Sequence, residues 1–194
     1  MRANGLNNSM LKESGWITDA RCGCAQKGLE WQYADLRSLC AQLLKDDVLA
    51  YPIENFARFD QVSKLVTLSV ALSLYDADIP YAKDKKQDIG IVGASPAGAL
   101  ASNFAYFRDY VAYGRKLGRG NLFIYTLASS PLAEAAIHFG LQGPTFYMRH
   151  LEKTEENLLA QAEMMVRNQE AQAMLAVVLD TGRATCHCIS GAGA

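Results

Sequence analysis

The sequence lacks the charge excess, the long apolar runs and the repeats that mark several classes of protein. Lysine and arginine number 19 and aspartate and glutamate 20, so the net charge of −1 gives no electrostatic case for binding nucleic acid or an anionic membrane. The apolar runs fall short of a membrane span, and the polar first residues lack the apolar core of a signal peptide. Without repeats or linkers, we expect a single domain.

Cysteine is scarce, and its number is odd. Five cysteines in a chain without a signal peptide favour reduced thiols and a cytoplasmic location. Two Cys-x-Cys pairs, Cys22 with Cys24 and Cys186 with Cys188, could in principle hold zinc. Cys-x-Cys is not the common knuckle, however, and cysteine is also a frequent small core residue. A metal- or thiol-binding function therefore stays one open hypothesis.

Hydrophobic residues make up half of the 194, enough for one α/β domain with a sizeable core. Residues 1–14 are expected to be a flexible lead, and residues 15–194 the domain. Periodicity and turn residues predict the elements of that domain. The predicted strands are 15–20, 89–93, 145–150, 173–179 and one beginning at 183, and the predicted helices are 29–50, 62–74, 104–113, 131–140 and 153–168.

Two patterns decide the fold class. Segment 62–74 is apolar nearly all round, so a helix there is buried and needs cover on more than one side. The succession of strand 145–150, helix 153–168 and strand 173–179 is the βαβ pattern of a parallel sheet. We therefore predict an α/β fold, with a mixed sheet of about five strands and helices packed on it.

The segment FGLQGP at 139–144, preceded by SSPLAEAAIH and followed by a strand, resembles β-ketoacyl synthases of the thiolase-like fold. RFDQVSK at 58–64, which opens the buried helix, is similar to the same family. The resemblance covers roughly residues 15–194, most specifically 58–182, and matches the N-terminal half of a ketosynthase. It implies a thiolase-like half fold.

The resemblance also implies where a nucleophile would stand. In the family, the strand after this motif ends in the nucleophilic cysteine, and the corresponding position here, nine residues beyond Gly143, holds Glu152. A carboxylate is a poor acyl acceptor from a thioester, because the product would be an anhydride. The two family histidines that assist decarboxylation belong to the half that the resemblance does not cover. We expect no independent condensing activity and no cofactor.

Family members that lack the cysteine are chain length factors, which pair with an active ketosynthase in making polyketides, polyenes or specialised fatty acids. The resemblance thus implies a ketosynthase as partner, with acyl carrier protein as a further one. In the family, the strand that leads to the nucleophile also pairs across the dimer axis. This implies a homodimer or heterodimer with an interface at Phe146, Tyr147 and Met148.

Two other interpretations of polar residues stay open. Glu152 precedes a predicted helix start, where charged residues are ordinarily solvated, but with His150 it could serve a small hydrolase or acyltransferase. His138 lies in the helix before Gly140 and is expected to be structural. The loop 93–98 follows a strand as a phosphate loop does, yet it lacks the lysine and the glycine spacing of such loops.

Overall fold

The computed structural model describes residues 14–116, 118–149 and 154–191. These residues form a seven-stranded sheet in the order β3-β2-β1-β7-β6-β4-β5. The strands are β1 Ser14–Ile17, β2 Arg21–Cys24, β3 Leu29–Gln32, β4 Ile89–Ala94, β5 Thr145–Met148, β6 Ala173–Asp180 and β7 Arg183–Ser190. The helices are α1 Leu36–Lys45, η1 Phe56–Arg58, α2 Gln61–Asp76, α3 Leu100–Ala112, α4 Gly120–Phe123, η2 Ile124–Thr126, α5 Ser130–Phe139 and α6 Thr154–Arg167.

The predicted α/β class is confirmed, but the sheet has seven strands rather than about five. The difference lies at the N-terminal end of the chain, where segment 29–50 was predicted to be one helix. Its first residues instead form β3, which pairs with β2 in an antiparallel hairpin through the turn at Gly28, whose φ is +62°. The helix begins only after Asp35, whose side chain accepts the backbone N–H groups of Arg37 and Ser38.

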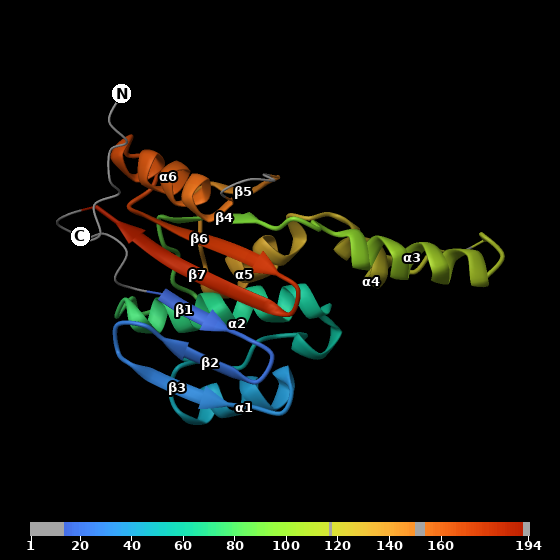
Figure 1. Ribbon diagram of the computed structural model, residues 1–194, viewed down its shortest axis with the longest axis horizontal. Coiled ribbons are helices and arrows are strands. Elements are labelled where there is room, and N and C mark those ends of the chain that lie inside the picture. Colours follow the sequence, from blue (N-terminus) through green and yellow to red (C-terminus); the bar gives the residue numbers. More distant parts are fainter. Residues whose placement is uncertain (1–13, 117, 150–153, 192–194) are drawn as a thin grey trace.

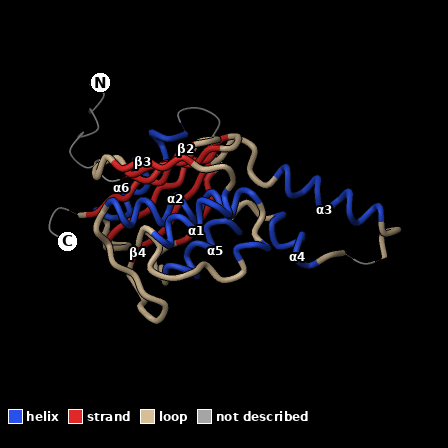
Figure 2. Tube along the Cα trace, turned by 90° about the horizontal axis from the view of Figure 1, so that it is seen from below, coloured by secondary structure: helices blue, strands red, loops and turns tan. Residues whose placement is uncertain are grey.

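Parallel pairing is confined to one part of the sheet. β4 pairs in parallel with β5 on one side and with β6 on the other, as the predicted βαβ pattern requires. β6 and β7 form an antiparallel pair, and β7 joins the sheet to the N-terminal strands by pairing with β1. Helices α1, α2 and α5 cover one face of the sheet, and α6 covers the other (Figures 1 and 2).

Helix α2 lies at the centre of the larger core. It begins at the N-cap Asp60, and every residue from Leu65 to Leu74 is buried. Strands β1 and β7 pack against it on one side, and α1 and α5 also contact it. Buried side chains of the segment 48–59 belong to the same core. The prediction that this helix needs cover on several sides is right, but the described chain supplies that cover itself.

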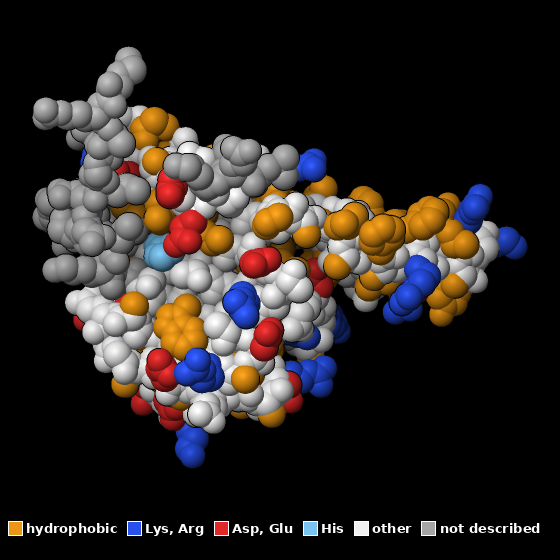
Figure 3. Space-filling view, in the orientation of Figure 1, with side chains coloured by type: hydrophobic (Ala, Val, Ile, Leu, Met, Phe, Trp, Pro, Cys, Tyr) orange, Lys and Arg blue, Asp and Glu red, His pale blue; other side chains and the backbone are white. Residues whose placement is uncertain are grey.

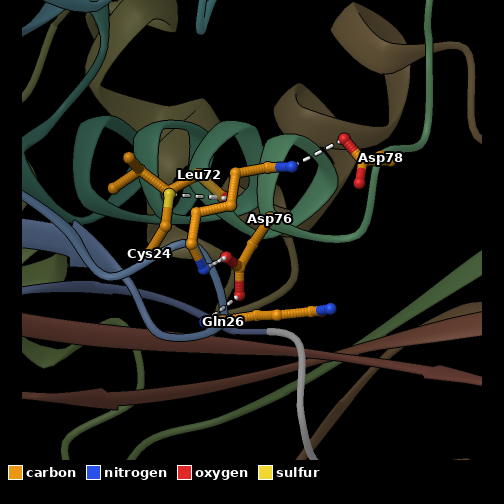
Figure 4. A network of polar contacts seen from close by, with 6 residues as sticks. Cys24, Gln26, Leu72, Asp76 and Asp78 are labelled. Carbon is orange, nitrogen blue, oxygen red and sulfur yellow. Dashed lines mark hydrogen bonds and ion pairs between the residues drawn. The ribbon is translucent and has the colours of Figure 1, made fainter.

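The contact between β1 and α2 is close because Gly15 has no side chain. A Cβ on Gly15 would lie 2.5 Å from both the Cβ of Leu72 and the backbone nitrogen of Ser73. At the end of α2, the buried carboxylate of Asp76 accepts three backbone N–H groups from the N-terminal strands and their turn. Figure 4 shows its contact with Gln26. The donors are Ser14 at 2.8 Å, Gln26 at 3.0 Å and Lys27 at 2.9 Å. Asp76 therefore fastens the N-terminal hairpin to the core helix.

We expect Asp76→Ala to lower the free energy of unfolding by about 3 kcal/mol, because three N–H groups would lose their acceptor. Asp76→Asn keeps one oxygen acceptor and should lose about half as much. Urea unfolding followed by circular dichroism measures both. Asp78→Asn is the matched control, since Asp78 is exposed and pairs with Lys27 at 2.6 Å, and asparagine tolerates its φ of +52° as aspartate does. It should therefore change stability little. Equal losses at Asp76 and Asp78 would refute the role given to Asp76.

Candidate functional site

The carboxyl ends of β4 and β5 meet at one edge of the sheet, because the two strands are parallel. Ligand sites of open α/β sheets are usually built at this edge. β4 continues into residues 95–99 and then α3, and β5 continues towards residues 150–153. The sequence-predicted residues His150 and Glu152 belong to that segment and lie outside the described residues.

Tyr147 and Ser95 join the two strands at this edge. The Tyr147 hydroxyl donates to the carbonyl oxygen of Ser95 at 2.6 Å. The N–H of Gly98 donates to the Ser95 side-chain oxygen at 3.1 Å, which closes the loop after β4 on itself. Gly98 has a φ of +55°, a conformation that a side chain would strain. The edge is thus held by polar contacts within the chain.

A second polar group lies where α3 leaves the body of the molecule. The Ser102 hydroxyl donates to one carboxylate oxygen of Asp60 at 2.6 Å, and the other oxygen caps α2 through the N–H of Ser63 at 2.8 Å. The Tyr125 hydroxyl donates to Glu134 at 3.4 Å. Burial, followed by repulsion from nearby carboxylates, raises the pKa of Tyr125 to about 12, and burial also raises the pKa of Glu134. The Ser102–Asp60 contact ties α3 to the N-cap of α2, and the Tyr125–Glu134 contact ties η2 to α5.

The hollow between the Tyr147–Ser95 contact and the Asp60–Ser102 contact is small. A hollow lined by Asp60, Ser95, Tyr125 and Tyr147, among others, has a volume of about 10 Å³. That is roughly the room of one water molecule, whereas pockets for drug-sized ligands measure about 300–1,000 Å³. This hollow is therefore too small for an acyl chain.

Strand β5 is the last strand of the described sheet, so one of its two backbone edges pairs with β4 and the other is open. The side chains of Phe146 and Met148 pack against the core under α6, and Tyr147 packs against the core around α2. All three are half-buried. The predicted interface at these residues stays a prediction, but it would have to use the backbone edge more than the side chains.

The most exposed apolar surface lies on a helical arm, residues 100–127, which projects from the body of the molecule (Figure 1). None of the thirteen residues of α3 is buried. Four apolar side chains on α3, which we call the seam, are exposed to solvent, and Figure 3 shows the arm covered with hydrophobic side chains. The seam consists of Leu100 (53% exposed), Phe104 (67%), Phe107 (61%) and Val111 (41%).

The arm holds itself together through another face of α3. The ring of Tyr106 contacts that of Phe123 in α4 at 5.5 Å between centroids, and Arg119 pairs with Asp109 at 3.0 Å. The seam takes no part in these contacts. The sequence predicts a helix over 104–113, but we assigned it no function. The spacing of the seam, four, three and four residues, is the signal in the sequence that points to a contact surface.

No family model matches the sequence, and no curated protein matches it. Solved structures do match the fold. The ishigamide ketosynthase/chain length factor is 12% identical with a TM-score of 0.65, over 95% of this chain and 62% of that one. The ketosynthase ApeO in complex with its chain length factor ApeC, from Xenorhabdus doucetiae, is 13% identical with a TM-score of 0.55, over 94% of this chain and 79% of that one. A β-ketoacyl synthase from Burkholderia phymatum is 11% identical with a TM-score of 0.58, over 94% of this chain and 59% of that one.

The chain has the ketosynthase fold. The predicted resemblance to ketosynthases and chain length factors is thereby confirmed at the level of the fold, which identities of this size can show. The chain spans about three fifths of the ishigamide protein and of the Burkholderia synthase. Among the described residues, no helix is both long and apolar enough to cross a membrane.

The structure places both Cys-x-Cys pairs on the α2 face of the sheet, in β2 and β7, which flank β1 on either side. Cys24 and Cys186 both lie opposite Gly15, so two strand spacings, about 10 Å, separate them. Zinc ligands require sulfurs within about 2.3 Å of one ion. Burial raises the pKa of Cys22 and Cys24 to about 12 and raises that of Cys186 as well. The described residues contain no group of three or more potential ligands that could hold a metal ion.

His138 lies in an aromatic cluster at the end of α5. Its ring lies 4.7 Å from that of Tyr51 and 4.6 Å from that of Phe139, and the Tyr51 hydroxyl donates to its carbonyl oxygen. Burial lowers the pKa of His138 to about 4, although the Glu54 carboxylate opposes this. A neutral, packed imidazole fits the predicted structural role. His187 lies on the opposite face of the sheet, where it contacts Glu155 at 3.0 Å.

We expect His138 to make stability depend on pH between about 6.5 and 4. Its pKa is lower in the folded chain than in the unfolded chain, so its contribution is present above pH 6.5 and is lost as the pH falls towards 4. After allowance for partial exposure, the loss is roughly 1–2 kcal/mol. Chemical unfolding of wild type and His138→Phe at pH 7 and pH 4.5 measures it. The loss between the two pH values should be smaller in the variant, and identical losses would contradict the assignment.

Proposed function

We propose that the chain is a non-catalytic ketosynthase homologue that serves as a partner subunit of an active ketosynthase, in the manner of a chain length factor. The observation that carries this proposal is the ketosynthase fold, and it is supported by Glu152 at the position that the sequence resemblance assigns to the nucleophile. Two of the matching structures are described as a ketosynthase with its chain length factor. The pathway we propose is the synthesis of a fatty acid, a polyene or a polyketide in the cytoplasm.

The chemistry of a carboxylate supports a role without catalysis. Acyl transfer to a ketosynthase proceeds through a thiolate, which is a strong nucleophile and gives a new thioester of similar energy. Transfer to Glu152 would give an anhydride, which is far more reactive than the thioester it comes from. The described hollow at the carboxyl edge, lined by Ser95 and Tyr147 among others, measures only about 10 Å³. Chain building is therefore assigned to the partner, with acyl carrier protein delivering its substrates.

The isolated chain is expected not to condense malonyl and acyl thioesters. The physical reason is the poor acyl acceptor at position 152, and Glu152→Cys alone should stay inactive, since the two family histidines that assist decarboxylation belong to the half that the resemblance does not cover. Release of carbon dioxide and formation of the β-ketoacyl product measure condensation. A preparation free of other ketosynthases that still forms product would refute the proposal.

The partner role has its own test. A tagged copy of the chain, expressed in the native host, should co-purify with a ketosynthase that has an intact nucleophilic cysteine. The recovered complex should condense thioesters, and the activity of that ketosynthase should fall when it is prepared without this chain. Recovery of the chain without a ketosynthase, or a ketosynthase that works equally well alone, would exclude the role.

A further inference from the structure

Another hollow lies between α5 and the segment 51–59, which leads into α2. Its volume is about 240 Å³. It shares no lining residue with the hollow at the carboxyl edge, so the two are separate sites. We call it the α5 pocket. The side chains around it come from three parts of the sequence and are those of Tyr51, Glu54, Asn55, Phe59, Lys83, Glu134, Ile137 and His138.

The lining of the α5 pocket carries more negative than positive charge. Lys83 pairs with Glu54 at 2.6 Å, so these two charges offset each other. Among the described residues, Glu134 pairs with no cation, and its side chain accepts only a long hydrogen bond of 3.4 Å from the Tyr125 hydroxyl. Burial and, after it, repulsion from Asp60 raise the pKa of Glu134. A cation that entered the pocket would supply the partner that this carboxylate lacks.

Aromatic and aliphatic side chains line the pocket beside these charges. The ring of Tyr51 lies 4.7 Å from the imidazole of His138 and 5.6 Å from the ring of Tyr81, and Phe59 also lines the pocket. The faces of aromatic rings attract cations. Ile137, which is 76% exposed, adds an aliphatic surface at the same place. A ligand that suits this lining therefore joins a positive charge to an apolar group.

The imidazole of His138 has an unused hydrogen-bonding nitrogen. Its Nε2 atom is buried and has no hydrogen-bond partner among the described residues, whereas buried polar atoms are usually paired. Burial lowers the pKa of His138 to about 4, so the ring is neutral at pH 7 and one of its nitrogens can accept a hydrogen bond. The torsion that turns the ring is broad, so a modest turn would present this nitrogen to the pocket. Glu134 lies one helical turn before His138, on the same face of α5.

The size and the charges of the α5 pocket limit the ligand. Pockets for drug-sized molecules measure about 300–1,000 Å³, and this one, at about 240 Å³, lies just below that range. It has room for a single ring or a short alkyl chain beside a charged group. An anion is disfavoured, because Lys83, the one cation in the described lining, is already paired with Glu54. A primary ammonium group suits the site, since its three N–H groups can serve Glu134 and His138 together.

We propose that the α5 pocket binds a small organic cation, in which a primary ammonium group is joined to a single aromatic ring or a short alkyl chain. The ammonium group donates to the Glu134 carboxylate and to the His138 imidazole, and the apolar part lies against Tyr51 and Ile137. This site goes beyond the proposed function and does not depend on it, because its lining includes no residue of the carboxyl edge or of the helical arm.

Titration of the full chain with benzylammonium, followed by nuclear magnetic resonance, tests the proposal. The signals to follow are the imidazole of His138 and the δ1 methyl group of Ile137, and a His138→Phe variant identifies the first among the three histidines of the chain. Both signals should shift in a saturable way at millimolar concentrations. Benzyl alcohol has the same ring and nearly the same size but no charge. It should bind at least about tenfold more weakly, because it lacks the charged hydrogen bond to Glu134.

Two variants of α5 test the residues. Glu134→Gln keeps the size of the side chain and removes its charge, so it should weaken benzylammonium binding at least about tenfold. Glu163→Gln is the matched control, since Glu163 is also helical but lies on α6, at the opposite face of the sheet, and its loss should leave binding unchanged. Ile137→Lys places an ammonium group three residues from Glu134, where it competes with the ligand. Ile137 is exposed, so this variant should fold like wild type, which circular dichroism and the urea midpoint verify.

Each contrary outcome overturns a definite part of the proposal. Signals of His138 and Ile137 that do not shift at millimolar benzylammonium exclude the site. Benzyl alcohol that binds as tightly would show a purely apolar hollow, and benzoate that binds more tightly would show that Lys83 attracts an anion; either result overturns the cation. Equal effects of Glu134→Gln and Glu163→Gln would place the ligand elsewhere. The proposed function stands or fails separately, on the recovery of a ketosynthase.

Discussion

The burial of α2 on every side is the constraint on which the other elements depend. A helix with no polar face has no side that can be left in water. The sheet must therefore cover one side of it, and other parts of the chain must cover the rest. β1 and β7 pack on it from the sheet, and α1, α5 and the segment 48–59 belong to the core around it. Gly15 allows the close approach of β1, and Asp76 fixes the N-terminal hairpin to the end of the helix. Strands β2 and β3, which the sequence did not predict, help to provide this cover.

The helical arm is the exception to this burial of apolar side chains. Within the described chain, apolar side chains are concentrated around α2 and under α6, yet α3 leaves all thirteen of its residues outside both cores. Its root is held in place by the contact of Ser102 with Asp60, so the orientation of the exposed face is set by the N-cap of the buried helix. The element that defines the core therefore also positions the exposed apolar face of α3.

The fold is shared with ketosynthase structures despite low sequence identity. The likeness to ketosynthase structures extends over 94–95% of the chain at identities of 11–13%. Backbone register and core volume are what such distant relatives share, since cores accept many apolar combinations. At the described edge, Tyr147 and Gly98 both make hydrogen bonds to Ser95. A shared fold does not by itself fix a shared function.

The sequence by itself determined the α/β class, the βαβ order of β5, α6 and β6, and the burial of α2, because periodicity records which faces of an element avoid water. It could not separate β3 from the helix after it, since residues 29–32 become a strand only by pairing with β2. It could not tell whether the two Cys-x-Cys pairs meet, because β1 lies between them only in the assembled sheet. The sequence contains the spacing of the four seam residues, but whether their side chains are exposed depends on how the whole chain folds. Only the tertiary structure decided that Phe104 and Phe107 face solvent while the equally apolar residues of α2 do not.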